Sequence, residues 1–248
     1  MASKRTIAFI TGANQGVGLA TAKILAKDHG YHVIIGSRNR EAGEKAAADI
    51  KAAGASASSV QLDLTSESSI KAAIDTIDRE FGHLDVLINN AGILLDGKPS
   101  SKDLSTWELY TRTFTTNVIG PATLTDGLVP LIRKAQAKPA RVIFVSTTMA
   151  SLKISTDEST PFYPVDYTSY DASKAAVNML MINYHRKLAD TGAKVNAVCP
   201  GLVKSNLTGY MEAGTSAEVG AQQVVKMATI GEDGPSRTFT RSDTELPW

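Results

Sequence analysis

Short apolar segments alternate with longer helical patterns along most of the chain, and this alternation constrains the fold more than any other feature. TIAFI at 6–10, HVIIG at 32–36 and RVIFV at 141–145 have the length of buried strands, and helical patterns separate them. Strands joined through helices pair in parallel by right-handed crossovers, which place helices on both faces of the sheet. The sequence therefore predicts an α/β fold with a doubly wound parallel sheet whose strands end at one edge, where a site is expected.

Length and composition indicate a single domain. A chain of 248 residues, of which 43% are hydrophobic, can bury one substantial core, and doubly wound sheets reach this length without splitting. Residues 1–248 are therefore expected to form one domain. Two connections, at about 147–169 and 203–220, are predicted to be substrate-binding loops, because long connections in a compact domain usually bind or cover a ligand.

Charge and cysteine content exclude several classes of partner. The net charge is +1 and there is no long run of Lys or Arg, so nucleic acid is not an expected partner. Cys199 is the only cysteine and the four histidines are scattered, so no metal site is predicted. An apolar strand starts at about Thr6 and no apolar run reaches membrane-spanning length, so we expect neither a signal peptide nor a membrane span. A soluble protein of the reducing cytoplasm is the expectation.

A glycine-rich turn follows the first predicted strand. Residues 11–18 read TGANQGVG and lead directly into a helix. Glycine lets the backbone turn sharply and approach a ligand, while a helix N-terminus offers free N–H groups and a positive dipole end to a pyrophosphate. A tight structural turn is the alternative, but the position between a strand and a helix favours dinucleotide binding. The residues predicted to contribute are Gly12, Asn14, Gln15, Gly16, Val17 and Gly18.

The end of the second strand indicates which dinucleotide is bound. Gly36, Ser37 and Arg38 stand where NAD-binding proteins usually carry an acidic residue that accepts hydrogen bonds from the adenosine ribose. Arg38 supplies a planar cation suited to a 2′-phosphate, and Ser37 can donate a hydrogen bond. The pattern favours NADPH over NADH, with a solvated surface arginine as the alternative interpretation.

Tyr170 is the only tyrosine with a lysine four positions later in a helical segment. Positions i and i+4 share one face of a helix, so the phenol and the ammonium of Lys174 can meet at one site. A phenol has a pKa near 10, and a nearby cation lowers it because the cation favours the phenolate. The pair is therefore a candidate acid or base for catalysis.

In their order and spacing these motifs resemble the short-chain dehydrogenase/reductase family, and the resemblance covers essentially the whole chain. It implies a Rossmann fold and an oxidoreductase that transfers hydride between a nicotinamide cofactor and its substrate. The matching elements are the turn at 11–18, Asp63 and Leu64 after the third strand, Asn89, Asn90, Ala91 and Gly92 after the fourth, Asn117 in helix five, Tyr170 with Lys174, and Pro200, Gly201 and Val203.

The resemblance also assigns roles to individual residues. It implies that Tyr170 donates the proton to a carbonyl oxygen, that Lys174 lowers the pKa of Tyr170 and binds the nicotinamide ribose, and that Asn117 holds a relay water. The cofactor contacts that it implies are the adenine for Asp63, the adenosine side for Asn90 and the carboxamide for the backbone after Pro200.

The sequence departs from the family at one catalytic position. The family places a serine one residue after the terminal Ser or Gly of the fifth strand, and alignment of RVIFVS at 141–146 puts Thr147 there. Threonine keeps the hydroxyl that hydrogen-bonds the substrate oxygen, although its methyl group narrows the site. Thr147 is favoured over Ser146, and the choice between them stays open.

Within the family, the segment CPGLVKS at 199–205 and the terminal Trp248 resemble the carbonyl reductase group. This implies NADPH-dependent reduction of a ketone, aldehyde or quinone, with a small-molecule carbonyl substrate. Two alternatives stay open: an NADP-dependent alcohol dehydrogenase that works oxidatively, and a non-catalytic dinucleotide-binding regulator. The extended segment before Tyr170 leaves monomer and homo-oligomer undecided. Its aromatic residues, Phe162, Tyr163 and Tyr167, either line a substrate pocket or anchor the loop.

Overall fold

One open sheet organises the chain, for which a computed structural model describes residues 5–248. Eight strands follow the order β3-β2-β1-β4-β5-β6-β7-β8, and all neighbours pair in parallel except β7 and β8. The chain reverses its direction across the sheet between β1 and β4, which is the switch point of a doubly wound fold. The strands are β1 (Ile7–Thr11), β2 (His32–Ser37), β3 (Ser56–Gln61), β4 (Val86–Asn89), β5 (Arg141–Val145), β6 (Lys194–Val198), β7 (Phe239–Arg241) and β8 (Thr244–Glu245).

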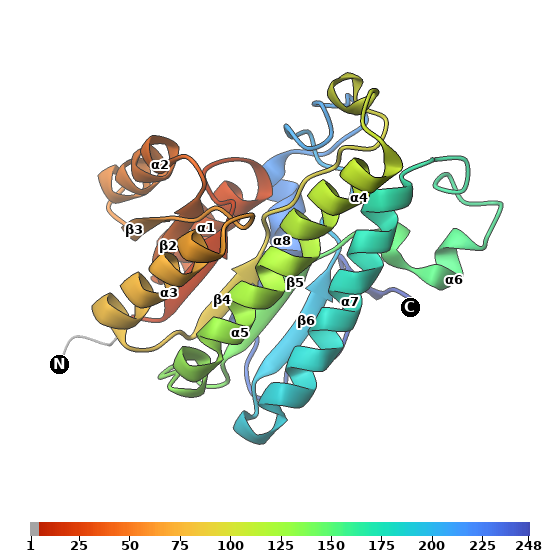
Figure 1. Ribbon diagram of the computed structural model, residues 1–248. Coiled ribbons are helices and arrows are strands. Elements are labelled where there is room, and N and C mark those ends of the chain that lie inside the picture. The colour runs from red at the N-terminus through yellow and green to blue at the C-terminus, as the bar shows by residue number, and fades with distance from the viewer. Residues whose placement is uncertain (1–4) are drawn as a thin grey trace.

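Helices cover both faces of the sheet (Figure 1). One apolar cluster joins the sheet to α3, α5 and α7, and a second joins it to α1, α2 and α8. The α-helices are α1 (Gly16–Asp28), α2 (Arg40–Ala52), α3 (Glu67–Phe81), α4 (Thr106–Phe114), α5 (Gly120–Arg133), α6 (Leu152–Ser155), α7 (Thr168–Leu188) and α8 (Ala217–Thr229). Single turns of other helix types lie at η1 (Pro99–Ser101), η2 (Thr115–Ile119), η3 (Thr148–Ala150) and η4 (Ala189–Thr191).

Strand β1 shows how the sequence builds this three-layer arrangement. All five residues of the strand are buried. Ile7 and Phe9 pack in the cluster under α3, α5 and α7, whereas Ala8 and Ile10 pack in the other. Successive side chains of a strand point to opposite faces, so a strand covered on both faces is apolar throughout. The predicted doubly wound α/β architecture is confirmed.

Several element boundaries differ from the sequence prediction. Asn117 lies in η2, a π-helical turn between α4 and α5, and not within α5 itself. The region at 147–169 contains η3 and α6, and α7 already begins at Thr168. In the region at 203–220, α8 begins at Ala217, because Ser216 caps it through the backbone N–H of Val219. Both regions still reach the edge of the sheet at which the parallel strands end.

Candidate active site

A cavity of about 640 Å³ opens at the carboxyl ends of the strands. It brings together segments that lie far apart in the sequence: the turn after β1, the loop after β4, the end of β5, the start of α7 and the loop after β6. The predicted site residues that line it are Gly12, Asn14, Gln15, Gly16, Val17, Asn90, Ala91, Gly92, Ser146, Thr147, Tyr170, Lys174, Pro200, Gly201 and Val203.

The glycine turn packs tightly against the loop after β4. A Cβ atom at Gly12 would lie 3.0 Å from Ala91 Cα, and one at Gly18 would lie 2.5 Å from Asn90 Nδ2. Gly12 has φ +64°, which favours glycine. Side chains are therefore excluded where the two loops meet, and α1 begins at Gly16 with its N-terminus at the cavity. The turn fits a dinucleotide pyrophosphate.

Asn90 connects these two loops. Its Nδ2 donates to the carbonyl oxygens of Thr11 and Gly12 at 2.8 and 3.3 Å. In return, Thr11 Oγ1 accepts hydrogen bonds from the backbone N–H groups of Asn90 and Ala91. The amide of Asn90 thus holds the glycine turn in shape, and its predicted contact with the adenosine side of a cofactor stays a prediction.

Tyr170 and Lys174 lie together on the buried face of α7. Both side chains are buried, and Lys174 Nζ lies 5.8 Å from the centre of the Tyr170 ring. Lys174 Nζ donates to the carbonyl oxygen of Val145 at 2.8 Å, at the end of β5. This bond holds the ammonium at the floor of the cavity, beside the phenol.

Asn117 lies behind Lys174, outside the cavity lining. Its Oδ1 accepts from the N–H of Ile93 at 2.8 Å, and its Nδ2 donates to the Ile93 carbonyl and to Ser173 Oγ. A Cβ atom at Gly92 would stand 3.3 Å from Lys174 Nζ and 3.4 Å from Asn117 Oδ1. The loop after β4 thus passes closely between the two groups, and a larger residue at Gly92 would have to displace one of them slightly. The π-helical turn that carries Asn117 is a feature often found at functional sites.

Burial governs the ionisation of both catalytic candidates. It raises the pKa of Tyr170 above its ordinary value and lowers the pKa of Lys174 to about 8. The shift of Tyr170 is opposite to the one that a neighbouring lysine alone predicts, because loss of water around the phenol is its largest cause, and Cys199 and Asp171 raise the pKa further. Tyr170 is therefore a neutral phenol in this structure, and the role of Lys174 in lowering its pKa stays a prediction.

Ser146 and Thr147 both face the cavity but differ in their hydrogen bonds. Ser146 is buried, and its Oγ finds no partner among residues 5–248. Thr147 is partly exposed, and its Oγ1 accepts a long bond of 3.4 Å from the N–H of Met149. Both hydroxyls thus remain candidates for contact with a substrate oxygen.

The residues predicted to select the cofactor lie outside the cavity lining. Ser37 is buried, and its hydroxyl donates to the Asn39 carbonyl at 2.8 Å, so the chain itself uses this donor. Arg38 is exposed at the end of β2. The N–H of Thr65, the hydroxyl of Thr65 and nearby Arg38 lower the pKa of Asp63. Leu64, the next residue, is buried. Gly18 packs against the side chain of Asn90.

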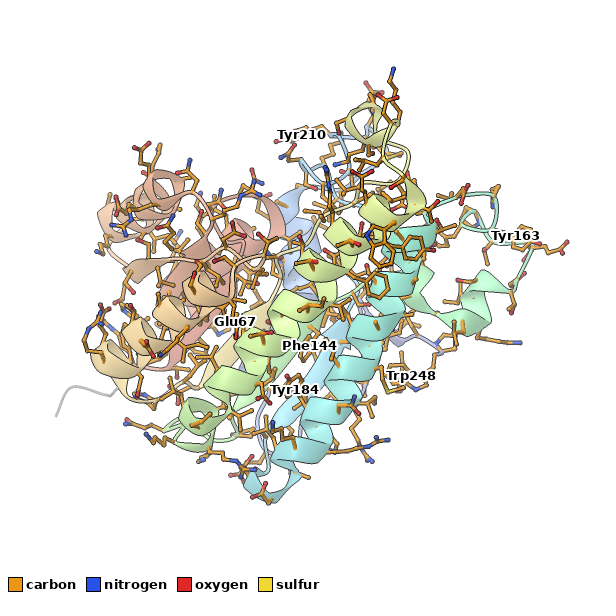
Figure 2. The ribbon with its side chains drawn as sticks, viewed as in Figure 1. Glu67, Phe144, Tyr163, Tyr184, Tyr210 and Trp248 are labelled. Atoms are coloured by element: carbon orange, nitrogen blue, oxygen red, sulfur yellow. The ribbon has the colours of Figure 1, made fainter. Side chains whose placement is uncertain are left out.

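Aromatic side chains at the mouth of the cavity point in different directions. Phe162 and Tyr167 line the cavity. Tyr163 does not: Figure 2 shows it projecting from its loop away from the sheet, and its hydroxyl donates to Glu158. Tyr210 stands at the rim with an exposed side chain. The pocket interpretation thus fits Phe162 and Tyr167, and surface exposure describes Tyr163.

Sequence reasoning did not predict some lining residues, such as Asp96 and Cys199, and predicted others, such as Ser205, only as part of the loops at about 147–169 and 203–220. Asp96 faces the cavity four residues after Gly92, and Ser205 stands 3.7 Å from the position of a Cβ atom at Gly16. Cys199 Sγ accepts hydrogen bonds from the N–H groups of Thr148 and Gly201. The position of Ser205 in the predicted loop at about 203–220 was the one available signal for it. Further apolar lining comes from Leu94, Met149, Leu202, Leu207 and Met211.

Comparison with known proteins identifies the family. The model of the short chain dehydrogenase family matches residues 6–215, and the chain belongs to the short-chain dehydrogenase/reductase family. A member from Stachybotrys chlorohalonatus is 35% identical over 99% of this chain and 95% of its own. Carbonyl reductase (NADPH) 1 of Mus musculus is 29% identical over the full length of both chains. The structure of NADPH-bound carbonyl reductase from chicken fatty liver is 25% identical, with a TM-score of 0.81 over 99% of this chain and 100% of that chain.

No helix between residues 5 and 248 is both long enough and apolar enough to cross a membrane.

Proposed function

We propose that the protein is an NADPH-dependent oxidoreductase that reduces a ketone, aldehyde or quinone to an alcohol, with Tyr170 as the proton donor. The observation that carries this proposal is the meeting of Tyr170, Lys174 and the glycine turn at one cavity at the switch-point edge of the sheet. The similarity to carbonyl reductases, one of them NADPH-bound, supports the same reaction.

The cofactor is NADPH, which supplies the hydride when it is bound. The N-terminus of α1, with Gly12 and Gly16 in the turn before it, would receive the pyrophosphate. Arg38 binds the 2′-phosphate, because its guanidinium is exposed and no acidic residue stands at the end of β2. Asp63 contacts the adenine, and the backbone after Pro200 contacts the carboxamide.

The proton comes from the side of the cavity formed by α7. Tyr170 carries a neutral phenol, which is the form that can donate a proton to a substrate oxygen. Lys174, held by the Val145 carbonyl, stabilises the phenolate that remains. Asn117 holds the loop after β4 against α7 and supports a relay that returns a proton to Tyr170. Thr147 donates a hydrogen bond to the substrate oxygen.

The same groups serve both directions of the reaction, because the phenol that donates a proton in reduction is the group that accepts one in oxidation. We favour reduction over an oxidative alcohol dehydrogenase because Arg38 suits NADPH. A regulator without chemistry needs no buried lysine beside a tyrosine, because burial of a charged group is costly.

The lining by Leu94, Met149 and Phe162 favours an apolar carbonyl substrate. The protein acts on small molecules in the cytoplasm.

The experiment that tests this function is the initial rate of NADPH and NADH oxidation by the purified protein with a panel of ketones, aldehydes and quinones. NADPH-selective turnover of apolar carbonyls is the expected result. Arg38→Gln should lose the selectivity and keep the turnover with NADH. Turnover with hydroxy acids or simple sugars alone, or no turnover with either cofactor, would contradict the proposal.

A further inference from the structure

The first turn of α7 carries the proton donor but has no cap of its own. The helix begins at Thr168, and the preceding residue, Tyr167, makes no side-chain capping bond within the described chain. The first N–H groups of a helix have no acceptor inside it, and leaving them unpaired in a buried place is costly. Tyr170 lies in this turn. Whatever satisfies these N–H groups therefore also holds the backbone of Tyr170.

Asp96 supplies this cap from a distant part of the sequence. Its Oδ1 accepts a hydrogen bond from the N–H of Ser169 at 2.9 Å. Its Oδ2 accepts from Ser169 Oγ at 2.7 Å and from the N–H of Tyr170 at 3.2 Å. Asp96 is 6% exposed, so these bonds form away from bulk water. A carboxylate is also favoured by the positive end of the helix, and bonds to a charged acceptor are stronger than neutral ones.

Neighbouring contacts fix the carboxylate in place. Gly97 follows directly, and a Cβ atom there would stand 3.4 Å from Tyr167 Cε1, so the loop lies closely on the residue that precedes α7. Thr113 Oγ1 lies 3.1 Å from Ser169 Oγ and joins the same group of hydrogen bonds to α4. The loop after β4, the end of α4 and the start of α7 thus meet at the bonds of Asp96.

We propose that Asp96 is a positioning residue for the reduction, which fixes the phenol of Tyr170 through the backbone of α7. The inference rests on the proposed role of Tyr170 as the proton donor. Both carboxylate oxygens accept bonds from α7, so Asp96 acts through the helix. Gly92 and Asp96 lie four residues apart in the loop after β4. This one loop therefore lines the cavity where the cofactor is proposed to bind and also fixes the position of the proton donor.

Two substitutions at Asp96 and one at its partner test this role in the full-length enzyme. Asp96→Ala removes every acceptor, Asp96→Asn keeps one, and Ser169→Ala removes only the hydroxyl donor. We expect kcat for carbonyl reduction to fall roughly 10- to 100-fold in Asp96→Ala, since a small misplacement of a reacting group costs this much. In Asp96→Asn and Ser169→Ala, kcat should fall less than in Asp96→Ala. The Kd for NADPH should stay near that of the wild type in all three variants.

Two further readouts separate positioning from general loosening. Proton donation should become more rate-limiting, so the solvent deuterium isotope effect on kcat should increase. Amide hydrogen exchange should become faster at Ser169 and Tyr170 and stay unchanged in the later turns of α7. Ser105→Ala is the matched control, because Ser105 caps α4 in the same way through the N–H of Glu108. It should lower stability without changing the isotope effect.

Three outcomes would overturn the proposal. In the first, Asp96→Asn and Ser169→Ala have the same kcat and the same solvent isotope effect as the control Ser105→Ala. Another is a weaker Kd for NADPH with unchanged kcat, which would place Asp96 in cofactor binding. The third is unchanged exchange at Ser169 and Tyr170. If Asp96→Ala does not fold, the other two variants decide. Lack of turnover in the wild type would contradict the reductase function, and the exchange measurement would still decide whether Asp96 holds the start of α7.

Discussion

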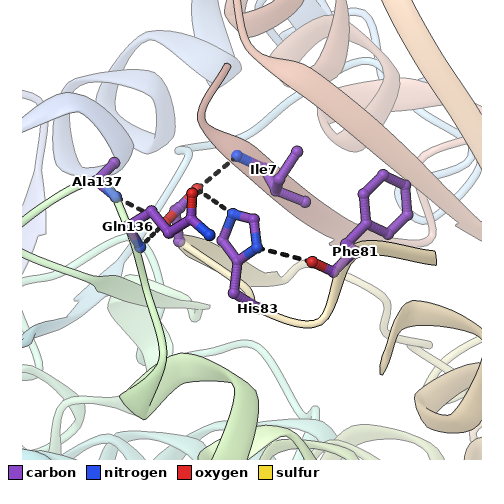
Figure 3. Close-up of polar contacts among 6 residues, drawn as sticks. Ile7, Phe81, His83, Gln136 and Ala137 are labelled. Atoms are coloured by element: carbon purple, nitrogen blue, oxygen red, sulfur yellow. Dashed lines mark hydrogen bonds and ion pairs between the residues drawn. The ribbon is translucent and has the colours of Figure 1, made fainter. Parts of the chain in front are cut away.

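Asp85 and the pair of Tyr170 and Lys174 are buried at opposite ends of the parallel sheet, and their surroundings satisfy them differently. At the amino ends of the strands, both oxygens of Asp85 accept hydrogen bonds from the backbone N–H groups of Ile7, Gln136 and Ala137, and His83 Nε2 lies 3.6 Å away (Figure 3). His83 is held in turn by the Phe81 carbonyl. Every polar atom of Asp85 thus has a partner that belongs to the fold.

The carboxyl ends leave polar atoms available. Tyr170 and Lys174 are buried like Asp85, yet burial shifts the pKa of each toward its neutral form. Ser146 Oγ has no partner in the described part of the chain. A cavity of about 640 Å³ adjoins these groups. The comparison teaches that burial alone does not mark a site. The mark is a group of buried polar atoms that adjoins a cavity, with at least one atom, Ser146 Oγ, left without a partner in the described chain.

The largest expected effect is a loss of turnover on substitution of Tyr170, at the carboxyl ends of the strands. Tyr170→Phe should lower kcat roughly 10²- to 10⁴-fold, because it removes the proton donor, while NADPH binding and the free energy of unfolding stay close to the wild type. The measurement is steady-state turnover together with NADPH binding by fluorescence. Tyr184→Phe is the matched control on the same helix: its hydroxyl donates to the Ala122 carbonyl at 2.6 Å, so it should cost about 1 kcal/mol of stability and no activity. Turnover that survives in Tyr170→Phe would refute the mechanism.

Asp85 should show the reverse pattern. Asp85→Ala leaves three backbone N–H groups without an acceptor, that of Ile7 in a buried place and those of Gln136 and Ala137 partly buried, so the free energy of unfolding should fall by about 3 kcal/mol. The folded fraction should keep the wild-type kcat. Chemical denaturation and active-site titration measure the two quantities. In the control Asp190→Ala, the lost ion pair with Arg133 is exposed, so the free energy of unfolding should stay close to that of the wild type. A loss of kcat without loss of stability in Asp85→Ala would remove the contrast between the two ends.

A smaller effect should decide between the two hydroxyls at the end of β5. Thr147→Val keeps the shape of the side chain and removes the hydroxyl, so kcat should fall roughly 10- to 100-fold if Thr147 stabilises the developing oxyanion. Ser146→Ala should then change kcat little. The reverse ranking of the two variants in steady-state kinetics would assign the role to Ser146, whose buried oxygen lacks a partner in the described structure.

Local spacing predicted the parts of the fold and site that depend on neighbours in the sequence. The β/α alternation, the turn at 11–18 and the pair Tyr170 and Lys174 are of this kind, because helix and strand periods alone place their side chains. The cap by Asp96 joins residues 73 positions apart and has no local signature. The raised pKa of Tyr170 depends on burial, which the sequence around it does not specify. The π-helical turn at Asn117 likewise has no period of its own to detect.

The smallest expected effect distinguishes two carboxylates, and it concerns pH. Asp171 follows Tyr170 on α7, and its buried Oδ1 has no partner among the described residues, in contrast to Asp85. Burial, with Asp96 and Asp166 nearby, raises the pKa of Asp171 from 3.8 to about 7. The folded state therefore holds this proton more tightly than the unfolded state, so the contribution to stability is complete below pH 4 and lost as the pH rises through 7. Asp171→Asn should remove that loss and be more stable than the wild type at pH 8, by roughly 1 kcal/mol at most, because water screens the half-buried side chain. Denaturant unfolding of both proteins at pH 5 and pH 8 measures the difference, and equal pH dependence in the two would show that Asp171 is as well satisfied as Asp85.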